Sequence, residues 1–101
     1  MTNIKFKPKR MHGEGTILFK DTKGRTVIRR AHNFLLLGLF ETEIWDMCDG
    51  KTTINEIASF VSNKYGITLK KAYDEISRFL RNLKEKELIS LENDINENNF
   101  N

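Results

Sequence analysis

Residues 44–58 read IWDMCDGKTTINEIA and hold the end of one predicted helix and the start of another. Asp49 and Gly50 end the first helix, because glycine readily takes the left-handed conformation that closes a helix. Thr53 and Glu56 have the spacing of a capping box, in which each side chain accepts a hydrogen bond from the other residue's backbone N–H. A second helix therefore begins after Thr53. Its apolar stripe consists of Ile54, Ile57, Ala58 and Val61.

A third helix is predicted next. Gly66 stops the second helix, and Thr68 is placed to cap another that runs from about Leu69 to Lys86. Its apolar residues recur at steps of three and four, as expected for a helix that packs one face against a core. They are Ala72, Ile76, Phe79, Leu80 and Leu83.

A β-hairpin is predicted nearer the N-terminus. The runs 16–20 (TILFK) and 26–29 (TVIR) are rich in β-branched and aromatic residues, and the loop DTKG between them suits a type I turn closed by glycine. Strand alternation puts Ile17 and Phe19 on one face of the hairpin, with Val27 beside them.

The segment 34–37 (FLLL) allows two interpretations. It can form a buried strand, with the first helix beginning after Gly38. Alternatively, Asn33 caps a longer helix over residues 34–48. We prefer the longer helix because four apolar side chains then recur at helical spacing. These are Leu36, Phe40, Ile44 and Met47.

Charge is unevenly distributed along the 101 residues, a length that fits one domain. Residues 1–31 carry nine basic and two acidic side chains, a net charge of +7. Residues 32–91 carry a net charge of −1 and residues 92–101 a net charge of −3. The basic first third favours an acidic partner, which is nucleic acid, anionic lipid or an acidic peptide.

The chain divides into three predicted segments. Residues 1–15 form a basic arm with room for a short strand near its start, at Ile4–Phe6. Residues 16–91 form the folded domain, and Leu88 and Ile89 complete its core. Residues 92–101 are acidic and rich in asparagine, a composition typical of a disordered tail.

Membrane insertion, secretion and catalysis find no support in the sequence. The longest apolar run, residues 34–40, is far shorter than the ~20 residues that span a bilayer, and no secretory signal follows the basic N-terminus. The single cysteine, Cys48, fits a cytoplasmic protein and suits a core position on its apolar helix stripe. Because His12 and His32 are far from it in sequence, we expect no metal site. Since Cys48 suits the core and the carboxylates near the first helix suit a solvated face, we also expect no cofactor and no enzyme activity.

Two surfaces are candidates for binding. The second hairpin strand carries Arg25, Arg29 and Arg30, and an unpaired edge there would accept an extended peptide as an added strand. Alternatively, these arginines only keep a solvent-exposed edge from pairing with other chains. The third helix has a second stripe that forms either a groove wall or the rim of an amphipathic helix. This stripe consists of Tyr73, Ser77, Leu80, Arg81 and Lys84.

The second and third helices also fit a helix-turn-helix, so a winged-helix DNA-binding regulator is the alternative function. Asp74 and Glu75 lie near the end of the third helix that would approach DNA. Because phosphates repel carboxylates, DNA is the less favoured partner.

Residues 44–58, the run KYGI at 64–67 and the pattern F-L-x-x-L-x-x-K-x-L-I at 79–89 follow one another in an order that resembles the PqqD-like family. The resemblance covers about residues 16–91. It implies an α+β, winged-helix-like fold in which a small antiparallel sheet of about three strands precedes three helices. Members of this family recognise the precursors of ribosomally synthesised and post-translationally modified peptides (RiPPs).

The resemblance implies a non-catalytic peptide chaperone. The leader segment of a precursor would pair with the third β-strand, pack against the third helix and be presented to a radical S-adenosylmethionine (radical SAM) enzyme, a protease or a cyclase. Two departures from the family pattern are Gly38, where Leu-Asn is usual, and Glu87, where Gly is common. The implied peptide edge is Thr26, Val27, Ile28, Arg29 and Arg30, and the opposing wall is Tyr73, Ser77, Leu80, Arg81 and Lys84.

Overall fold

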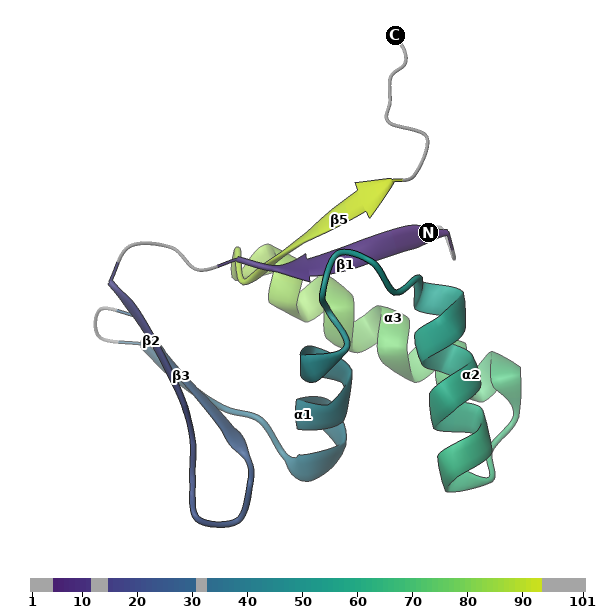
Figure 1. The fold of residues 1–101 in the computed structure, drawn as a ribbon, viewed down its shortest axis with the longest axis horizontal. Coiled ribbons are helices and arrows are strands. Elements are labelled where there is room, and N and C mark those ends of the chain that lie inside the picture. Colours follow the sequence, from purple (N-terminus) through teal and green to yellow (C-terminus); the bar gives the residue numbers. More distant parts are fainter. Residues whose placement is uncertain (1–4, 12–14, 31–32, 94–101) are drawn as a thin grey trace, which may run out of the picture.

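The computed structural model describes residues 5–11, 15–30 and 33–93. Within them the strands form two small antiparallel sheets, one of β1 and β5 and one in the order β2–β3–β4. The larger sheet projects to one side of the helices, and α1 lies between it and α2 (Figure 1). The expected α+β class is confirmed, with a two-stranded sheet added to the three-stranded one. The elements are β1 (Phe6–Arg10), β2 (Thr16–Lys20), β3 (Thr26–Arg30), β4 (Asn33–Leu36), α1 (Leu39–Asp46), α2 (Ile54–Tyr65), α3 (Leu69–Glu85) and β5 (Ile89–Asn93).

The predicted hairpin is confirmed as β2 and β3, with β3 one residue longer than expected. Its turn is closed by a hydrogen bond of 3.0 Å from the Gly24 backbone N–H to the Asp21 carbonyl, and Gly24 has a φ of 84°. The Asp21 carboxylate accepts the backbone N–H groups of Lys23 and Arg25, each at 2.9 Å. These bonds to the ionised form, led by that from Arg25, lower the pKa of Asp21.

The preferred long first helix is wrong, and the alternative strand is correct. Residues 33–36 form β4, which pairs with β3, and α1 begins only after Gly38. The Leu37 backbone N–H donates to the Thr26 carbonyl at 2.8 Å. Pairing with β3 therefore engages backbone groups that a helix would use for its own hydrogen bonds. Asn33 therefore lies in a strand and caps no helix. A short apolar run has no periodicity that separates a strand from a helix.

The two later helices form where the sequence predicts them. Thr53 and Glu56 exchange both hydrogen bonds of the capping box, at 2.8 and 3.1 Å, and Gly66 closes α2 with a φ of 65°. The Thr68 hydroxyl caps α3 by accepting the Lys71 backbone N–H. The end of α3 at Glu85 lies one residue before the predicted end.

β1 is built into the protein along both of its edges. One edge pairs with β5, from Phe6 opposite Asn93 to Arg10 opposite Ile89. On the other edge the Arg10 backbone N–H donates to the Cys48 carbonyl at 3.0 Å, and the Gly50 N–H donates to the Pro8 carbonyl at 2.9 Å. The strand of the arm begins at Phe6, the last residue of the predicted Ile4–Phe6, and continues to Arg10. β5 includes the first two residues of the predicted tail. Residues 94–101 lie outside the described part of the chain.

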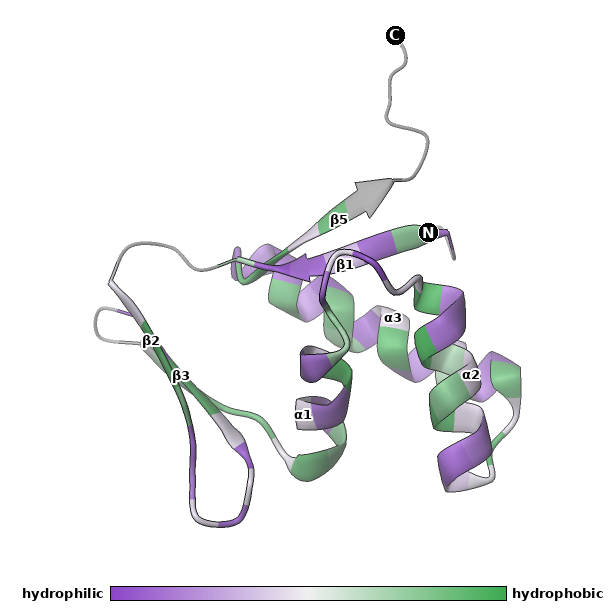
Figure 2. Ribbon diagram, in the orientation of Figure 1, coloured by the Kyte–Doolittle hydropathy of each residue, from purple (hydrophilic) through white to green (hydrophobic). Residues whose placement is uncertain are grey.

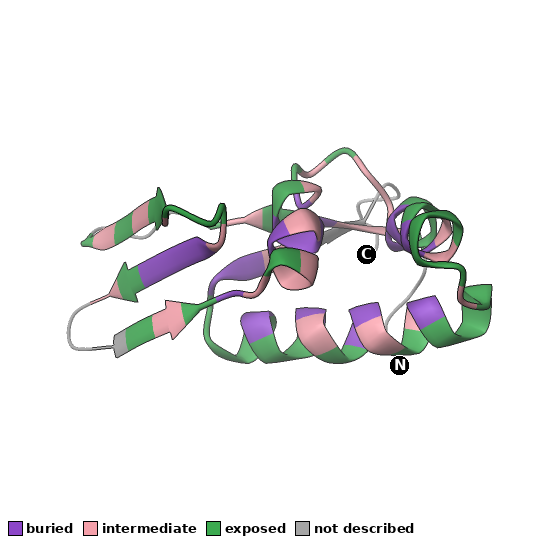
Figure 3. Cartoon of the chain, turned by 90° about the horizontal axis from the view of Figure 1, so that it is seen from below, coloured by how far each residue is buried: buried purple, intermediate pink, exposed green. Residues whose placement is uncertain are grey.

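The core lies between the three helices, the inner face of the larger sheet and the start of β5. Ile28, Ile44, Ile57 and Ile76 are buried there, and Leu80 is fully buried. Figure 3 shows the buried residues on the sides of the helices that face one another. This core holds α3 beside the sheet, which positions the site described next.

Candidate functional site

The expectation that Thr26 to Arg30 form an unpaired strand edge is wrong. These residues are β3, the middle strand of the sheet, with β2 on one side and β4 on the other. Thr26, Val27 and Ile28 are buried, while Arg29 is exposed and Arg30 is partly exposed. The backbone groups of β3 are taken by its neighbours, so β3 has no edge to offer to another chain.

The open edge near α3 belongs to β4. No described strand pairs with its outer side, and it is the strand of this sheet that lies nearest to α3 in Figure 3. In an antiparallel pair, residues alternate between those that bond to the partner strand and those that do not. Because Leu37 bonds to β3, this alternation directs the backbone groups of Leu35 toward β3 and those of Phe34 and Leu36 toward the free edge.

A hollow of about 330 Å³ lies beside this edge. It separates the inner face of β3 and β4 from the residues that follow α3. Apolar side chains form much of its lining, with two cationic side chains at its margin. The lining residues are Ile28, Arg30, Phe34, Leu35, Lys86 and Leu88.

Arg30 connects the sheet to the end of α3 across this hollow. Its guanidinium donates to the carbonyls of Lys86 and Glu87, each at 3.1 Å, and to the Thr16 hydroxyl at 3.2 Å. Cations are favourable at the carbonyl end of a helix, where the backbone dipoles leave a partial negative charge. Arg30 therefore fixes the width of the hollow and places a positive charge at its rim.

The predicted wall on α3 is only partly available. Leu80 is fully buried in the core, and Ser77 is 7% exposed with a hydroxyl that has no hydrogen-bond partner among the described residues. Tyr73 is half-buried and packs against the core. Arg81 and Lys84 are exposed on α3. None of these five residues is among those that line the hollow, whose α3 side comes from Lys86 and Leu88.

Sequence reasoning missed Phe34, Leu35, Lys86 and Leu88 as site residues. The apolar run before Gly38 could have indicated the first two residues, but only if this run is interpreted as a strand. Lys86 and Leu88 belong to the turn after α3, where Glu87 has a φ of 58°. The Leu88 N–H there donates to the Leu83 carbonyl at 2.9 Å, which turns the chain back toward the sheet.

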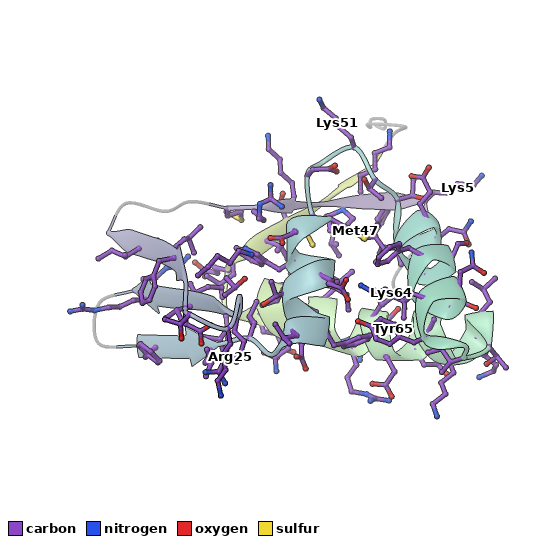
Figure 4. The ribbon with its side chains drawn as sticks, turned by 60° about the horizontal axis from the view of Figure 1, so that its bottom comes forward. Lys5, Arg25, Met47, Lys51, Lys64 and Tyr65 are labelled. Atoms are coloured by element: carbon purple, nitrogen blue, oxygen red, sulfur yellow. The ribbon has the colours of Figure 1, made fainter. Side chains whose placement is uncertain are left out.

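A charged cluster holds α1 against α2, away from the hollow. Figure 4 shows Lys64 and Tyr65 extending from α2 toward α1. Both donate hydrogen bonds to the Glu43 carboxylate. The bond from Lys64, followed by that from Tyr65, lowers the pKa of Glu43. The Phe40 ring packs edge-on to Tyr65 with 5.3 Å between centroids, so this cluster has the contacts of a structural joint.

The described residues offer no metal site and no reactive thiol. They contain no group of three His, Cys, Asp or Glu side chains able to hold a metal ion. Burial raises the pKa of the Cys48 thiol to about 12, and its Sγ–H donates to the Ile44 carbonyl at 3.3 Å. Cys48 is thus a buried core residue, as predicted. Of the described helices, none has the length and apolar character that crossing a membrane requires.

The helices and the turns between them carry a family signature. Residues 42–89 match the family model described as coenzyme PQQ synthesis protein D, PqqD. This segment is PqqD-like. The resemblance read from the sequence is thereby confirmed from Thr42 in α1 through α2 and α3 to the first residue of β5. No curated protein and no solved structure matches the chain.

A PqqD-like segment implies a peptide-binding partner protein in the biosynthesis of PQQ or other RiPPs, where such proteins are non-catalytic accessories. The matched residues contain Lys86 and Leu88 on one side of the hollow. They do not include β3 or β4 on its other side. The assignment of β3 and β4 to the site therefore rests on the structure and not on the family match.

Proposed function

We propose that this chain is a non-catalytic, cytoplasmic adaptor that binds the leader segment of a RiPP precursor and presents it to a modifying enzyme. The leader pairs as an added strand with the edge of β4 and packs its inward side chains into the adjacent hollow. The enzyme is a radical SAM enzyme, a protease or a cyclase. No cofactor takes part in the chain's own role.

The observation that carries this proposal is the unpaired edge of β4 beside an apolar hollow. A strand edge supplies main-chain hydrogen bonds to an extended peptide, and adjacent pockets select its alternate side chains. Phe34 and Leu36 supply the backbone groups, while Ile28, Leu35 and Leu88 supply the apolar surface. The site is thus one strand later than the edge predicted from the sequence.

Cationic side chains surround the same site and favour a leader with acidic residues. Arg30 and Lys86 line the hollow, and Arg81 and Lys84 are exposed on the neighbouring turns of α3. Attraction between exposed charges is modest and is screened by salt. We therefore assign most of the affinity to strand pairing and apolar contact, and assign to these cations the orientation of the leader.

α3 is less suited to DNA than the sequence alone indicates. Its cations Lys70 and Arg78 form ion pairs with Asp74 and Glu75, each at 3.3 Å. A recognition helix needs cations free to meet phosphates. Because Lys70, Asp74, Glu75 and Arg78 lie in the half of α3 that would approach DNA, this pairing favours the peptide over the DNA alternative, although Arg81 and Lys84 farther along α3 are exposed.

The test is isothermal titration calorimetry of the full chain with synthetic leader segments of the short precursor peptides encoded beside its gene. We expect one leader to bind with a micromolar or tighter Kd. Leu36→Pro should weaken binding by about tenfold or more, because proline removes an edge N–H worth about 1 kcal/mol and its ring obstructs pairing. Leu36→Ala keeps the N–H and should bind with nearly the original affinity.

A matched control is available on the other free edge. Lys20→Pro makes the same backbone change on β2, far from the hollow, and should leave leader affinity within about twofold. Absence of binding by every encoded leader would refute the adaptor. Equal losses in Leu36→Pro and Lys20→Pro would move the site away from β4.

A further inference from the structure

The outer face of the β2–β3–β4 sheet, which points away from the helices, is built from two rows of side chains that run across the strands. Phe19, Val27 and Leu36 stand opposite one another in the first row. Ile17, Arg29 and Phe34 form the second row. Directly paired residues point to the same side of a sheet, so all six side chains share this face.

This face is apolar and exposed along its two outer strands, while Val27 on the middle strand is buried. Its four outer side chains, Ile17, Phe19, Phe34 and Leu36, are between 44% and 66% exposed. Hydrophobic residues run along the strands although helices lie on only one side of the sheet (Figures 1 and 2). A contiguous apolar patch of this kind on a folded domain marks a surface that meets another molecule.

Arg29 is the only charged residue in these two rows. It is exposed, and its guanidinium has no hydrogen bond or ion pair with any described residue. The neighbouring cation Arg30 already bonds to the carbonyls of Lys86 and Glu87. At the opposite end of the hairpin, Lys20 binds Asp46 at 3.0 Å and Arg25 binds Asp21 at 2.7 Å. The face therefore consists of apolar side chains around Arg29, a cation with no partner among the described residues.

We propose that this outer face docks the modifying enzyme, through an apolar surface of the enzyme that presents a carboxylate to Arg29. Burying the aromatic and aliphatic side chains supplies the affinity, and the ion pair at the centre of the contact fixes its orientation. The choice of the modifying enzyme as partner rests on the proposed function.

Charge selects against a second copy of this chain as the occupant. Two such faces related by a two-fold axis parallel to β3 would bring the Arg29 guanidinium of each copy close to that of the other. Like charges placed together at an interface oppose association. A partner with a carboxylate at this point removes that penalty.

The position of the face relative to β4 suits delivery of a peptide. Phe34 and Leu36 belong both to the outer face and to the strand whose edge accepts the leader. A strand added to β4 would continue the sheet, with every second side chain on the outer face. An enzyme docked there lies directly beside the bound leader, and Phe34 at the sheet edge borders both the outer face and the hollow.

The experiment measures binding of the full chain to each radical SAM enzyme, protease or cyclase encoded beside its gene, by biolayer interferometry. We expect one enzyme to bind, and Arg29→Glu to weaken this binding by tenfold or more. Phe19→Ser should also weaken it. The matched control is Lys51→Glu, the same change of charge at an exposed residue of the turn between α1 and α2, which should stay within twofold.

Three results would overturn the inference: no encoded enzyme binds, one binds wild type and Arg29→Glu equally, or the chain dimerises in sedimentation equilibrium through this face. Leader titrations on the same samples separate the two proposals. A chain that binds leader but no enzyme loses only the docking face. A chain that binds enzyme but no leader loses the proposed function.

Discussion

The two sheets of the described chain are both small and antiparallel, but they differ in what lies along their edges. β1 is paired with β5 on one side and bonded to the turn at Cys48–Gly50 on the other. In the larger sheet, the outer sides of β2 and β4 pair with no described strand. One sheet is closed into the core, and the other is left open.

This difference separates a structural sheet from a binding sheet. Unpaired strand edges invite uncontrolled association, so proteins usually cover or blunt them. Here β1, the basic N-terminal strand, has hydrogen-bond partners along both of its edges in the closed sheet. The β4 edge stays open beside a hollow of about 330 Å³. The following predictions test this contrast, beginning with the largest expected effect.

Truncating a side chain of the closed sheet should destabilise the protein far more than truncating one of the open sheet. Ile89 on β5 is 2% exposed, and Ile89→Ala should lower the free energy of unfolding by about 2–5 kcal/mol. Phe34 on β4 is 66% exposed, and Phe34→Ala should change it by less than about 0.5 kcal/mol. Urea denaturation measures both, and similar losses would contradict the contrast.

Arg10 of the closed sheet should likewise contribute more to the free energy of unfolding than Arg29 of the open sheet. Arg10 donates to the carbonyls of Trp45 and Asp46 at 2.9 and 2.8 Å, at the end of α1. Arg10→Met removes both bonds and should cost about 1–2 kcal/mol. Arg29→Met removes no bond to a described residue and should leave stability unchanged within about 0.5 kcal/mol. A loss at Arg29 equal to that at Arg10 would mean that the outer face is structural.

The turn between α3 and β5 should accept a stabilising glycine. Glu87 has a φ of 58°, a conformation that is unfavourable for residues with a Cβ. Glu87→Gly should raise the free energy of unfolding by about 1 kcal/mol without changing leader affinity. Gly66 has a φ of 65° and open space around it, so Gly66→Ala should destabilise by a similar amount. Thermal unfolding of both variants checks the opposite signs.

The smallest expected effect is a loss of stability in acid, through the hairpin turn at Asp21 and the turn at Asp49. The Asp49 carboxylate, beside β1, accepts the backbone N–H of Lys51 and of Thr52, bonds that lower its pKa. A lowered pKa means that the stabilisation is present above the ordinary value of 3.8 and is lost as pH falls through the folded-state pKa. Asp49→Asn and Asp21→Asn should each flatten the fall in stability below about pH 4. An unchanged slope in urea titrations across this range would contradict the assignment.

Local signals in the sequence predicted the helices and the hairpin well. The capping box of Thr53 and Glu56, the closing glycines and the loop DTKG each depend on residues within a few positions, and each forms as expected. The alternation that places Ile17 and Phe19 beside Val27 also holds. These features need no knowledge of the rest of the fold.

Long-range pairing could not be predicted in the same way. Whether residues 33–36 form a helix or a strand depends on the bond from Leu37 to Thr26 and on β3, neither of which leaves a periodic signal. The peptide edge predicted at Thr26 to Arg30 failed for this reason, because a fourth strand covers it. The partnership of β1 with β5 joins the two ends of the described chain, a pairing that local patterns do not reveal.

The most direct test of the account is hydrogen exchange of the backbone amides of Phe34 and Leu36, followed by NMR with and without saturating leader peptide. We expect both amides to exchange rapidly in the free chain, while the Arg10 amide of the closed sheet is protected, and to become at least tenfold slower when the leader binds. If these amides are already protected in the free chain, or stay unprotected in a saturated complex, the β4 edge does not receive the peptide.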